Sequence, residues 1–318
     1  MPKNLAIDPK EMEKTQARLR AEAARLLRDG AVTVFLGHEE GWDGLPVPFF
    51  AKTAEEAERL VWNPLVAFNL AKYLLDRLGD DGKVGLVVNG CGSLALDRIL
   101  KDRRFPRERL YVVGVPCTGL LDPDKVLGLP EAERKAALEG RGDPGLFLKR
   151  CGWCAAPNPV IADVLIGEKV PESEAAPGPL EFPRVAEIEA MSPKERFEYF
   201  QGMFDRCIRC FACRNVCPAC NCRECCLDQW EPLWLGRAVV PSEQLMYHFI
   251  RAMDVAGRCI RCGECERVCS VGIPLMELND KFMKDIIELF GVERPDIPAE
   301  VEPLGQFAES DPDLESSQ

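Results

Sequence analysis

The sequence predicts two domains: an α/β domain with a mostly parallel sheet, followed by a mainly α-helical domain that is rich in cysteine. The first prediction rests on apolar, strand-like runs that alternate with helical segments between residues 31 and 116, a pattern typical of parallel sheets with crossover helices. The second rests on the cysteines, which are absent from residues 1–90, whereas eight lie within 207–226 and four within 259–269. This change in composition divides the chain into 1–191, 192–290 and an acidic tail, 291–318.

The first domain is expected to open with a helix and a strand. Residues 10–29 have a helical composition and end before a glycine, and AVTVFLG, 31–37, is an apolar run of strand length. Thr53 followed by AEEAERL resembles a capped helix start. Asn63 could cap a second helix that runs to about Leu78.

Three further elements continue the alternation: a strand over 83–90, a helix over 93–100 and a strand over 109–116. Cys91 and Cys117 follow the carboxyl ends of the two strands. Ligands of open α/β sheets gather at this edge. Both cysteines are therefore candidate ligands.

The second domain is expected to be built from helices. Ser192 opens one of them, with proline in its first turn, and two more are expected over 241–256 and 275–290. After Gly291, eight acidic side chains face a single basic one, Arg294. Together with the prolines of this stretch, this charge indicates a solvated or partner-bound tail.

Composition narrows the classes of function. The chain has 318 residues, a net charge of −12 and a pI of about 4.9, which argues against nucleic-acid binding. It has no run of ~20 apolar residues for a membrane span and no apolar core of a signal peptide, so we expect a cytoplasmic protein. There, sixteen cysteines indicate metal rather than disulfides. Because His38 and His248 are the only histidines, such sites must be almost entirely thiolate.

Two copies of one cysteine motif lie 52 residues apart, RCIRCFACRNVCP at 206–218 and RCIRCGECERVCS at 258–270. Each spells C-x2-C-x2-C-x3-C, in which three close thiolates reach three irons of a cubane cluster, while the fourth opens a helix and turns toward the other cluster. This crosswise pattern predicts two [4Fe–4S] clusters. Their ligands would be Cys207, Cys210, Cys213 and Cys269 for the first cluster, and Cys259, Cys262, Cys265 and Cys217 for the second.

Structural zinc is the alternative for these cysteines, since four thiolates can also surround one ion. Zinc ribbons use paired C-x2-C knuckles rather than triplets closed by x3-C, so the spacing favours iron–sulfur clusters. The arginines repeat too, Arg206 with Arg258 and Arg209 with Arg261. They could stabilise a reduced, negatively charged cluster or form a solvated basic face, and the sequence leaves both open.

Eight cysteines lie outside the repeat, and four of them follow its first copy in CPACNCRECC. Cys220, Cys222 and Cys225 could hold an additional cluster with one remote ligand. Alternatively, this segment, which ends in Cys226, contains buried free thiols. The other four are Cys91, Cys117, Cys151 and Cys154.

These last four cysteines could also bind a cluster, because two of them are expected at neighbouring strand ends and Cys151-x2-Cys154 is a common ligand pair. A redox-active dithiol at CGWC is the main alternative, although the strand and helix that flank such a motif in thioredoxin are missing. The third possibility is that these four thiols are unrelated to one another. NGCGS, 89–93, is a glycine loop before a helix and hence a weak candidate for phosphate binding.

The chain resembles the beta subunits of deazaflavin-reducing hydrogenases and formate dehydrogenases. Three stretches carry this resemblance: NGCGSLAL (89–96), VVGVPCTGLLD (112–122) and CGWCAAPNPVIADVLIGE (151–168). The last contains an Ala-Asp-x-x-x-Gly segment of that family, with Ala162, Asp163 and Gly167. The second domain resembles the dicluster ferredoxin modules that accompany such subunits and heterodisulfide-reductase-like proteins. Family members typically carry this module at the amino terminus, whereas here it follows the α/β domain.

The resemblance implies an electron-transfer subunit of a soluble complex, which exchanges electrons with other subunits and, in many members, with a bound FAD that reduces a deazaflavin. We therefore expect a relay of single electrons and assign no catalytic residue. Cys117 is a weak candidate nucleophile because only two histidines could serve as its base. Clusters near the surface would be oxygen-labile, which favours an anaerobic host.

Two other functions stay open at this stage. One is a flavin-dependent reductase that exchanges hydride with a deazaflavin or NAD(P). No flavin-binding residue is assigned to it, because the chain lacks the dinucleotide fingerprint. The other is a scaffold stabilised by zinc.

Overall fold

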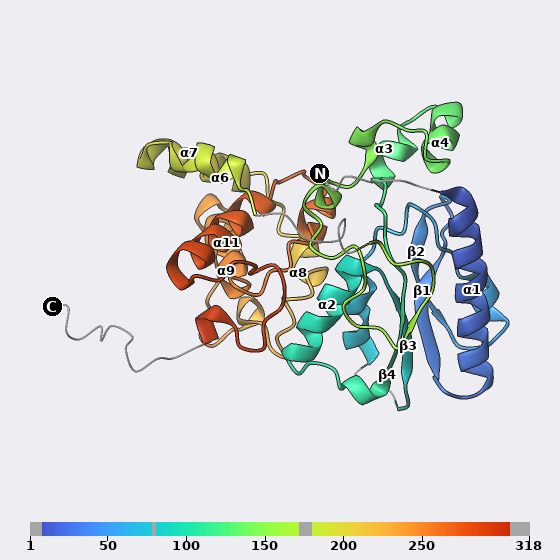
Figure 1. The fold of residues 1–318 in the computed structure, drawn as a ribbon. Coiled ribbons are helices and arrows are strands. Elements are labelled where there is room, and N and C mark those ends of the chain that lie inside the picture. Colours follow the sequence, from blue (N-terminus) through green and yellow to red (C-terminus); the bar gives the residue numbers. More distant parts are fainter. Residues whose placement is uncertain (1–7, 78–80, 172–179, 306–318) are drawn as a thin grey trace.

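A computed structural model describes residues 8–77, 81–171 and 180–305 of the chain (Figure 1). The predicted helix end at Leu78 and the last four acidic residues of the tail lie outside these residues.

The first half contains five strands: β1 (Val34–Glu40), β2 (Pro46–Ala51), β3 (Val84–Val88), β4 (Leu110–Gly114) and β5 (Val164–Leu165). They form one sheet in the order β2-β1-β3-β4-β5. β1, β3, β4 and β5 run parallel to one another, and β2 pairs with β1 in the antiparallel sense. The prediction of a mostly parallel sheet is therefore confirmed.

Two helices, α1 (Pro9–Arg28) and α2 (Gly90–Lys101), lie on opposite sides of this sheet (Figure 1). The side chain of Asp8 caps the start of α1 by accepting backbone hydrogen bonds from its first turn. Asn89 caps α2 in the same way, by accepting from the N–H of Gly92 at 2.8 Å. All five residues of β3 are buried, as a parallel sheet covered on both faces requires.

The strands differ from the predicted ones at one edge of the sheet. β1 begins three residues later than predicted, and β2 has no counterpart among the predicted elements. Pro46 and Pro48 interrupt the pattern of β2. Because proline lacks an N–H, it is confined to edge strands, and β2 is such an edge.

The helices expected after Thr53 and Asn63 are shorter 3₁₀ helices, η1 (Glu56–Arg59) and η2 (Leu70–Arg77). The side chain of Asn63 accepts a hydrogen bond from the N–H of Leu65 at 2.8 Å. Such local bonds compete with the α-helical ladder. Other elements of this half have no predicted counterpart: α3 (Pro123–Leu127), α4 (Glu131–Leu138), η3 (Arg107–Arg109), η4 (Pro144–Leu146) and η5 (Lys149–Trp153).

The second half contains six helices within the described residues: α6 (Pro183–Glu189), α7 (Pro193–Phe204), α8 (Ala212–Asn215), α9 (Pro241–Asp254), α10 (Glu264–Arg267) and α11 (Met276–Phe290), with the 3₁₀ helices η6 (Cys226–Asp228) and η7 (Pro303–Gly305). The three predicted helices correspond to α7, α9 and α11. Ser192 and Glu195 form a capping box that begins α7. Across the part of the chain that the structure covers, no helix has the length and apolar character to cross a lipid bilayer.

The two halves are in contact at the carboxyl end of α2, which faces the helical half (Figure 1). Asp102, just after α2, accepts a hydrogen bond from Arg258 of the second cysteine motif at 2.7 Å. The same carboxylate accepts one from the side chain of Asn221 at 2.7 Å. One acidic residue of the α/β half thus holds two cysteine-bearing segments of the other half.

The tail was expected to be solvated or partner-bound, but several of its residues within 292–305 are buried against the rest of the chain. Asp296 is fully buried and pairs with Arg294 at 2.6 Å. Glu302 pairs with Arg98 of α2, whose side chain is only 2% exposed. A buried guanidinium needs such a carboxylate partner, so this part of the tail packs against the α/β half.

Candidate cluster-binding sites

The two copies of the cysteine motif have the same backbone shape. Arg209 and Arg261, which are equivalent in the repeat, have φ values of 52° and 54°, and the equivalent Phe211 and Gly263 have values of 59° and 66°. Each loop then enters a four-residue helix, α8 or α10, and these helices pack against each other. A left-handed residue with a Cβ costs roughly 1–2 kcal/mol, so both loops hold the same strained curve around their cysteines.

The first cysteine set consists of Cys207, Cys210, Cys213 and Cys269. Burial raises the pKa of Cys207, and the nearby thiols of the other three raise it further. Backbone N–H groups also reach the sulfurs. Arg209 donates to Sγ of Cys207 and Ile273 to Sγ of Cys269, each at 3.3 Å. Donors of this kind stabilise the charge of a thiolate.

The second cysteine set consists of Cys259, Cys262, Cys265 and Cys217. Burial raises the pKa of all three triplet thiols, and the charge of Cys217 adds to this effect at each of them. Asn279 of α11 lies beside this set, with its amide nitrogen 3.9 Å from Sγ of Cys259 and 3.9 Å from Sγ of Cys265.

Each of these sets combines a triplet from one copy of the motif with the fourth cysteine of the other copy. The expectation that the fourth cysteine opens a helix is wrong, because Cys217 and Cys269 come two residues after the ends of α8 and α10. The two sets also adjoin, since Cys265 interacts electrostatically with Cys213.

The third cysteine set consists of Cys91, Cys117, Cys151 and Cys154, and it lies at the carboxyl edge of the parallel strands. Cys91 is in the first turn of α2 after β3, and Cys117 is three residues beyond β4. Cys151 lies in η5 and Cys154 directly after it. Burial raises the pKa of Cys117, and the charges of the other three thiols raise it further, so the four thiols lie together.

The thiols of CGWC do not have the properties of a reactive dithiol. Reactive cysteines have lowered pKa values, whereas burial raises the pKa of Cys151 and raises that of Cys154 to about 12. Burial likewise argues against Cys117 as a nucleophile. A bound metal would lower these raised thiol pKa values, because a coordinating thiol is deprotonated outright.

The glycines of NGCGS have a packing role. A Cβ added to Gly90 would lie 1.6 Å from the carbonyl oxygen of Ala156, so only glycine allows this approach. Nearby, the N–H of Val160 donates to Oγ of Ser93 at 2.9 Å. The segment after CGWC therefore covers the start of α2. This packing explains why the loop contains glycine, and no bound phosphate is needed to explain it.

Asp163 of the Ala-Asp-x-x-x-Gly segment ties β5 to β4. Its carboxylate accepts a hydrogen bond from the N–H of Val112 at 2.7 Å and pairs with Arg107 at 2.7 Å. Gly167 follows β5 with a φ of 99°, a conformation that favours glycine. These two residues hold the chain that leaves the third cysteine set against the sheet.

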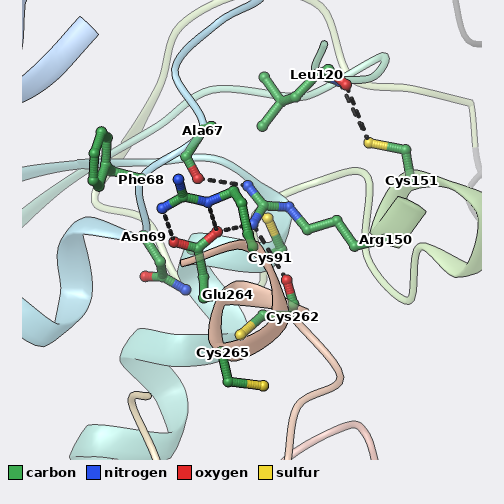
Figure 2. A network of polar contacts seen from close by, with 12 residues as sticks. Ala67, Phe68, Asn69, Cys91, Leu120, Arg150, Cys151, Cys262, Glu264 and Cys265 are labelled. Atoms are coloured by element: carbon green, nitrogen blue, oxygen red, sulfur yellow. Dashed lines mark hydrogen bonds and ion pairs between the residues drawn. The ribbon is translucent and has the colours of Figure 1, made fainter. Parts of the chain in front are cut away.

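Arg150 links the third cysteine set to the second (Figure 2). It precedes Cys151 and pairs with Glu264, which precedes Cys265. The two side chains are 8% and 0% exposed. Arg267 completes the network by pairing with the other oxygen of Glu264 at 2.8 Å. Buried charges persist only when paired in this way, so the contact between the halves is specific.

Further hydrogen bonds hold the same junction. Arg150 donates to the carbonyl oxygens of Cys262 at 3.2 Å and Ala67 at 2.7 Å. Trp153, inside CGWC, donates from its indole nitrogen to the carbonyl oxygen of Arg261 at 2.9 Å. The loops that bear the second and third cysteine sets are therefore in direct contact.

The remaining cysteines do not form one group. Cys220 interacts most strongly with Cys217, through a hydrogen bond that lowers the pKa of Cys217 to about 6 and raises that of Cys220. Cys222, Cys225 and Cys226 interact with one another. The structure thus places Cys220 beside the second cysteine set and the other three in a separate group.

Three of the four repeated arginines have partners other than thiols. Arg209 donates to the carbonyl oxygen of Ala238 at 2.6 Å. Arg258 pairs with Asp102, and Arg261 pairs with Asp280 at 2.9 Å. The fourth, Arg206, is exposed. These contacts brace the two loops against the rest of the molecule.

Sequence reasoning missed a group of polar side chains on α9 that face the cysteines. The hydroxyl of Tyr247 lies 3.2 Å from Sγ of Cys213, and Gln244 donates to the carbonyl oxygen of Cys207. His248 and Arg251 share this buried face. Their spacing of three and four residues places them on one side of a helix and was the signal that could have revealed them.

The donor sets fit iron–sulfur clusters. All sixteen cysteines lie within the described residues and are free thiols, and each of the three sets offers four thiols, the number that one cubane needs. Within those residues, no three His, Cys, Asp or Glu side chains converge on a point that could hold a single metal ion. The ligands of a cubane bind different irons and need not converge.

No protein-family model matches the chain. It is 23% identical over 334 residues to the F420-dependent formate dehydrogenase subunit beta of Methanocaldococcus jannaschii, covering 83% of this chain and 86% of the relative. It is 22% identical over 373 residues to the F420-dependent formate dehydrogenase 1 subunit beta of Methanococcus maripaludis, covering 94% and 95%. The resemblance predicted from the three stretches of the first half is thus confirmed.

Among solved structures, a chain of the F420-reducing [NiFe] hydrogenase complex from Methanosarcina barkeri matches with a TM-score of 0.30 and 16% identity. The match covers 40% of this chain and 47% of that one, less than half of either.

Proposed function

We propose that this chain, which is similar to the beta subunits of F420-dependent formate dehydrogenases, is the iron–sulfur electron-transfer subunit of a multisubunit oxidoreductase complex. It relays single electrons through three [4Fe–4S] clusters, held by the first, second and third cysteine sets. We place it in the cytoplasm, where free thiols persist.

The observation that carries this proposal is the crosswise grouping of the two motifs. Cys217 raises the pKa of each triplet thiol of the second copy, and Cys269 raises that of Cys207 in the first. Two-cluster ferredoxins use their fourth cysteines in this way. Two paired zinc knuckles would instead draw their ligands from neighbouring C-x2-C pairs.

The contacts between the sets suggest an order for the relay. The first and second sets adjoin where Cys213 interacts with Cys265. The second and third sets adjoin at Arg150, which contacts the carbonyl of Cys262 and lies beside Cys91 (Figure 2). The cluster of the second set is therefore the middle one of the three, and electrons pass through it between the helical half and the α/β half.

When bound, such clusters supply one-electron chemistry at potentials set by charge, hydrogen bonding and exposure. The residues around the sets control these factors. The N–H groups of Arg209 and Ile273 and the amide of Asn279 point at the sulfurs. The second set is shielded from water, because Cys265 is buried and the other three thiols are half-buried.

The first set is the point nearest to a partner subunit. Cys210 is the exposed member of that set, and Ile208, beside it in the loop, is 59% exposed. The exposure of Cys210 would bring the first cluster close to an electron donor or acceptor that binds at this loop. We expect the partner to be another subunit of the redox complex.

The second candidate function is a flavin-dependent reductase that exchanges hydride with a deazaflavin or NAD(P), with FAD bound by the α/β half. The observation that favours it is the name of the two formate dehydrogenase relatives, which are F420-dependent. A hydride acceptor of that kind requires a group that converts hydride into single electrons.

Anaerobic purification followed by iron, zinc and flavin analysis tests these proposals. We expect about twelve irons per chain and a broad visible absorption that bleaches with dithionite. Eight irons would limit the relay to two clusters. A colourless protein with stoichiometric zinc would overturn the relay in favour of a scaffold. Stoichiometric flavin, together with oxidation of a hydride donor, would establish the second candidate.

A further inference from the structure

Helix α9 buries polar side chains and exposes apolar ones. Its buried face is mostly polar: Gln244, Tyr247, His248 and Arg251 are each at most 3% exposed, with Ala252 beside them, whereas apolar Phe249 is 51% exposed. A helix of a globular domain normally buries its apolar face. A buried polar face requires something polar or charged opposite it, and the residues opposite this one include cysteines of the first and second sets.

Arg251 is the charged member of this face. Its side chain is 1% exposed, and the one hydrogen bond it donates goes to the side-chain oxygen of Asn279 at 3.3 Å. Its Nε and Nη1 atoms are buried without a hydrogen-bond partner among the described residues. Its guanidinium is therefore largely uncompensated by the protein itself.

The other buried arginines of the described chain all have carboxylate partners. Arg98 pairs with Asp102 and Glu302, Arg150 with Glu264, and Arg261 with Asp280. An isolated buried cation costs several kcal/mol. Arg251 is thus expected to have an anionic partner that is not a carboxylate.

The groups that do act on Arg251 are thiols. Burial lowers its pKa, but the charges of Cys265, Cys213, Cys220 and Cys217 outweigh burial and raise it. Cys213 belongs to the first set, Cys265 and Cys217 belong to the second, and Cys220 lies beside the second. The neighbouring His248 does not share the charge, because burial lowers its pKa to about 3 and leaves it neutral.

We propose that Arg251 is a positioning residue that supplies a shared positive charge to the two clusters of the first and second cysteine sets and thereby raises the reduction potential of both. This inference rests on the proposed function. Reduction adds one negative charge to a cluster, and a fixed cation between the two sites stabilises that reduced state at each of them. The third set is held by segments of the α/β half, whereas Asn279, the hydrogen-bond partner of Arg251, lies beside the second set.

Redox titration of the full chain, followed by electron paramagnetic resonance, tests this assignment in Arg251→Met and Arg251→Lys. In Arg251→Met we expect the reduction equilibrium of two clusters to shift about tenfold toward the oxidised form, which is about 59 mV for one electron. The signal of the third set should not shift. Arg251→Lys keeps the charge and should restore most of the potential.

Arg98→Met is the matched control, since it removes another buried guanidinium whose partners are carboxylates. It should leave all three potentials unchanged. Unchanged potentials in an iron-replete Arg251→Met protein, or an equal shift of all three clusters, would overturn the assignment. If Arg251→Met loses iron, Arg251→Lys decides: retention of iron and potential supports the charge, and loss of iron shows a purely structural role.

The wild-type protein separates this inference from the function on which it rests. A wild-type chain without iron would remove the proposed function itself. If the wild-type chain binds its clusters but their reduction potentials are the same in Arg251→Met, only this inference is overturned.

Discussion

Arg150 and Glu264 form a buried ion pair whose members stand next to cysteines from different halves of the chain. Arg150 precedes Cys151, and Glu264 precedes Cys265. The pair spans 114 residues of sequence. It is the buried ion pair among the contacts that join the third and second cysteine sets, so the interface between the halves depends on the charge of Glu264.

Removing the charge of Glu264 should destabilise the protein strongly. In Glu264→Gln, Arg150 and Arg267 lose their shared carboxylate, and we expect the free energy of unfolding to fall by about 3–5 kcal/mol. Anaerobic urea denaturation followed by circular dichroism measures this loss. The matched control is Lys149→Gln, which breaks an ion pair with Glu266 in which Lys149 is 70% exposed and should cost about 1 kcal/mol or less. Equal losses in both variants would contradict the role of the buried pair.

Replacing Cys217 should damage the cluster of the other motif. We expect Cys217→Ala to alter the same paramagnetic signal as Cys262→Ala, and Cys210→Ala to alter a different one, because Cys217 lies with the second set. Spectra of the three reduced variants decide this. Cys226→Ala, outside the three sets, serves as the control. The crosswise assignment fails if Cys217→Ala and Cys210→Ala affect one and the same signal.

The third cysteine set should account for about four irons. Cys154→Ala removes one of its ligands, and we expect the iron content per chain to fall by about that amount while the signals of the first two sets persist. Iron analysis beside Cys226→Ala measures the difference. An unchanged iron content in Cys154→Ala would show that this set holds no cluster.

Gly263→Ala should cost stability through the backbone alone. Gly263 has a φ of 66°, and an added Cβ would meet nothing closer than Cβ of Arg150 at 3.8 Å. We expect a loss of about 1 kcal/mol with full iron content, measured by urea denaturation and iron analysis. Gly272→Ala is the control, because Gly272 has a φ of 63° and open space around it. A loss far above that of Gly272→Ala would mean that the motif loop tolerates no added side chain.

Acid should weaken the α/β half through His38. Burial lowers the pKa of His38 from 6.5 to about 4, so the unfolded chain binds a proton that the folded chain refuses. Above pH 6.5, His38 is neutral in both the folded and the unfolded chain, so its burial does not make stability depend on pH. As the pH drops from 6.5 to 4, the unfolded chain takes up a proton and the free energy of unfolding falls by up to about 3 kcal/mol. Unfolding of wild type and His38→Gln across this range isolates the effect, since His248 titrates in both. Parallel pH profiles would refute it.

The elements that the sequence predicted well are those whose signals are local. The apolar run of β3 and the start of α7 at Ser192 each depend on signals within a few residues. β2 was missed because its two prolines obscure the strand pattern, and only its place at the edge of the sheet explains them. The helices expected after Thr53 and Asn63 shortened because side chains there bond to nearby backbone groups.

The cysteine spacing, by itself, determined that this chain carries two copies of one cysteine motif and predicted which cysteine serves which set, because a short loop can present only three sulfurs to one cluster. The tertiary structure decided what surrounds those sulfurs. It turned the polar side chains of α9 inward, buried Arg251 near cysteines of two sets, and paired Arg150 with Glu264. The face that a helix buries, and the carboxylate that a buried arginine meets, depend on segments distant in sequence, and no local pattern records them.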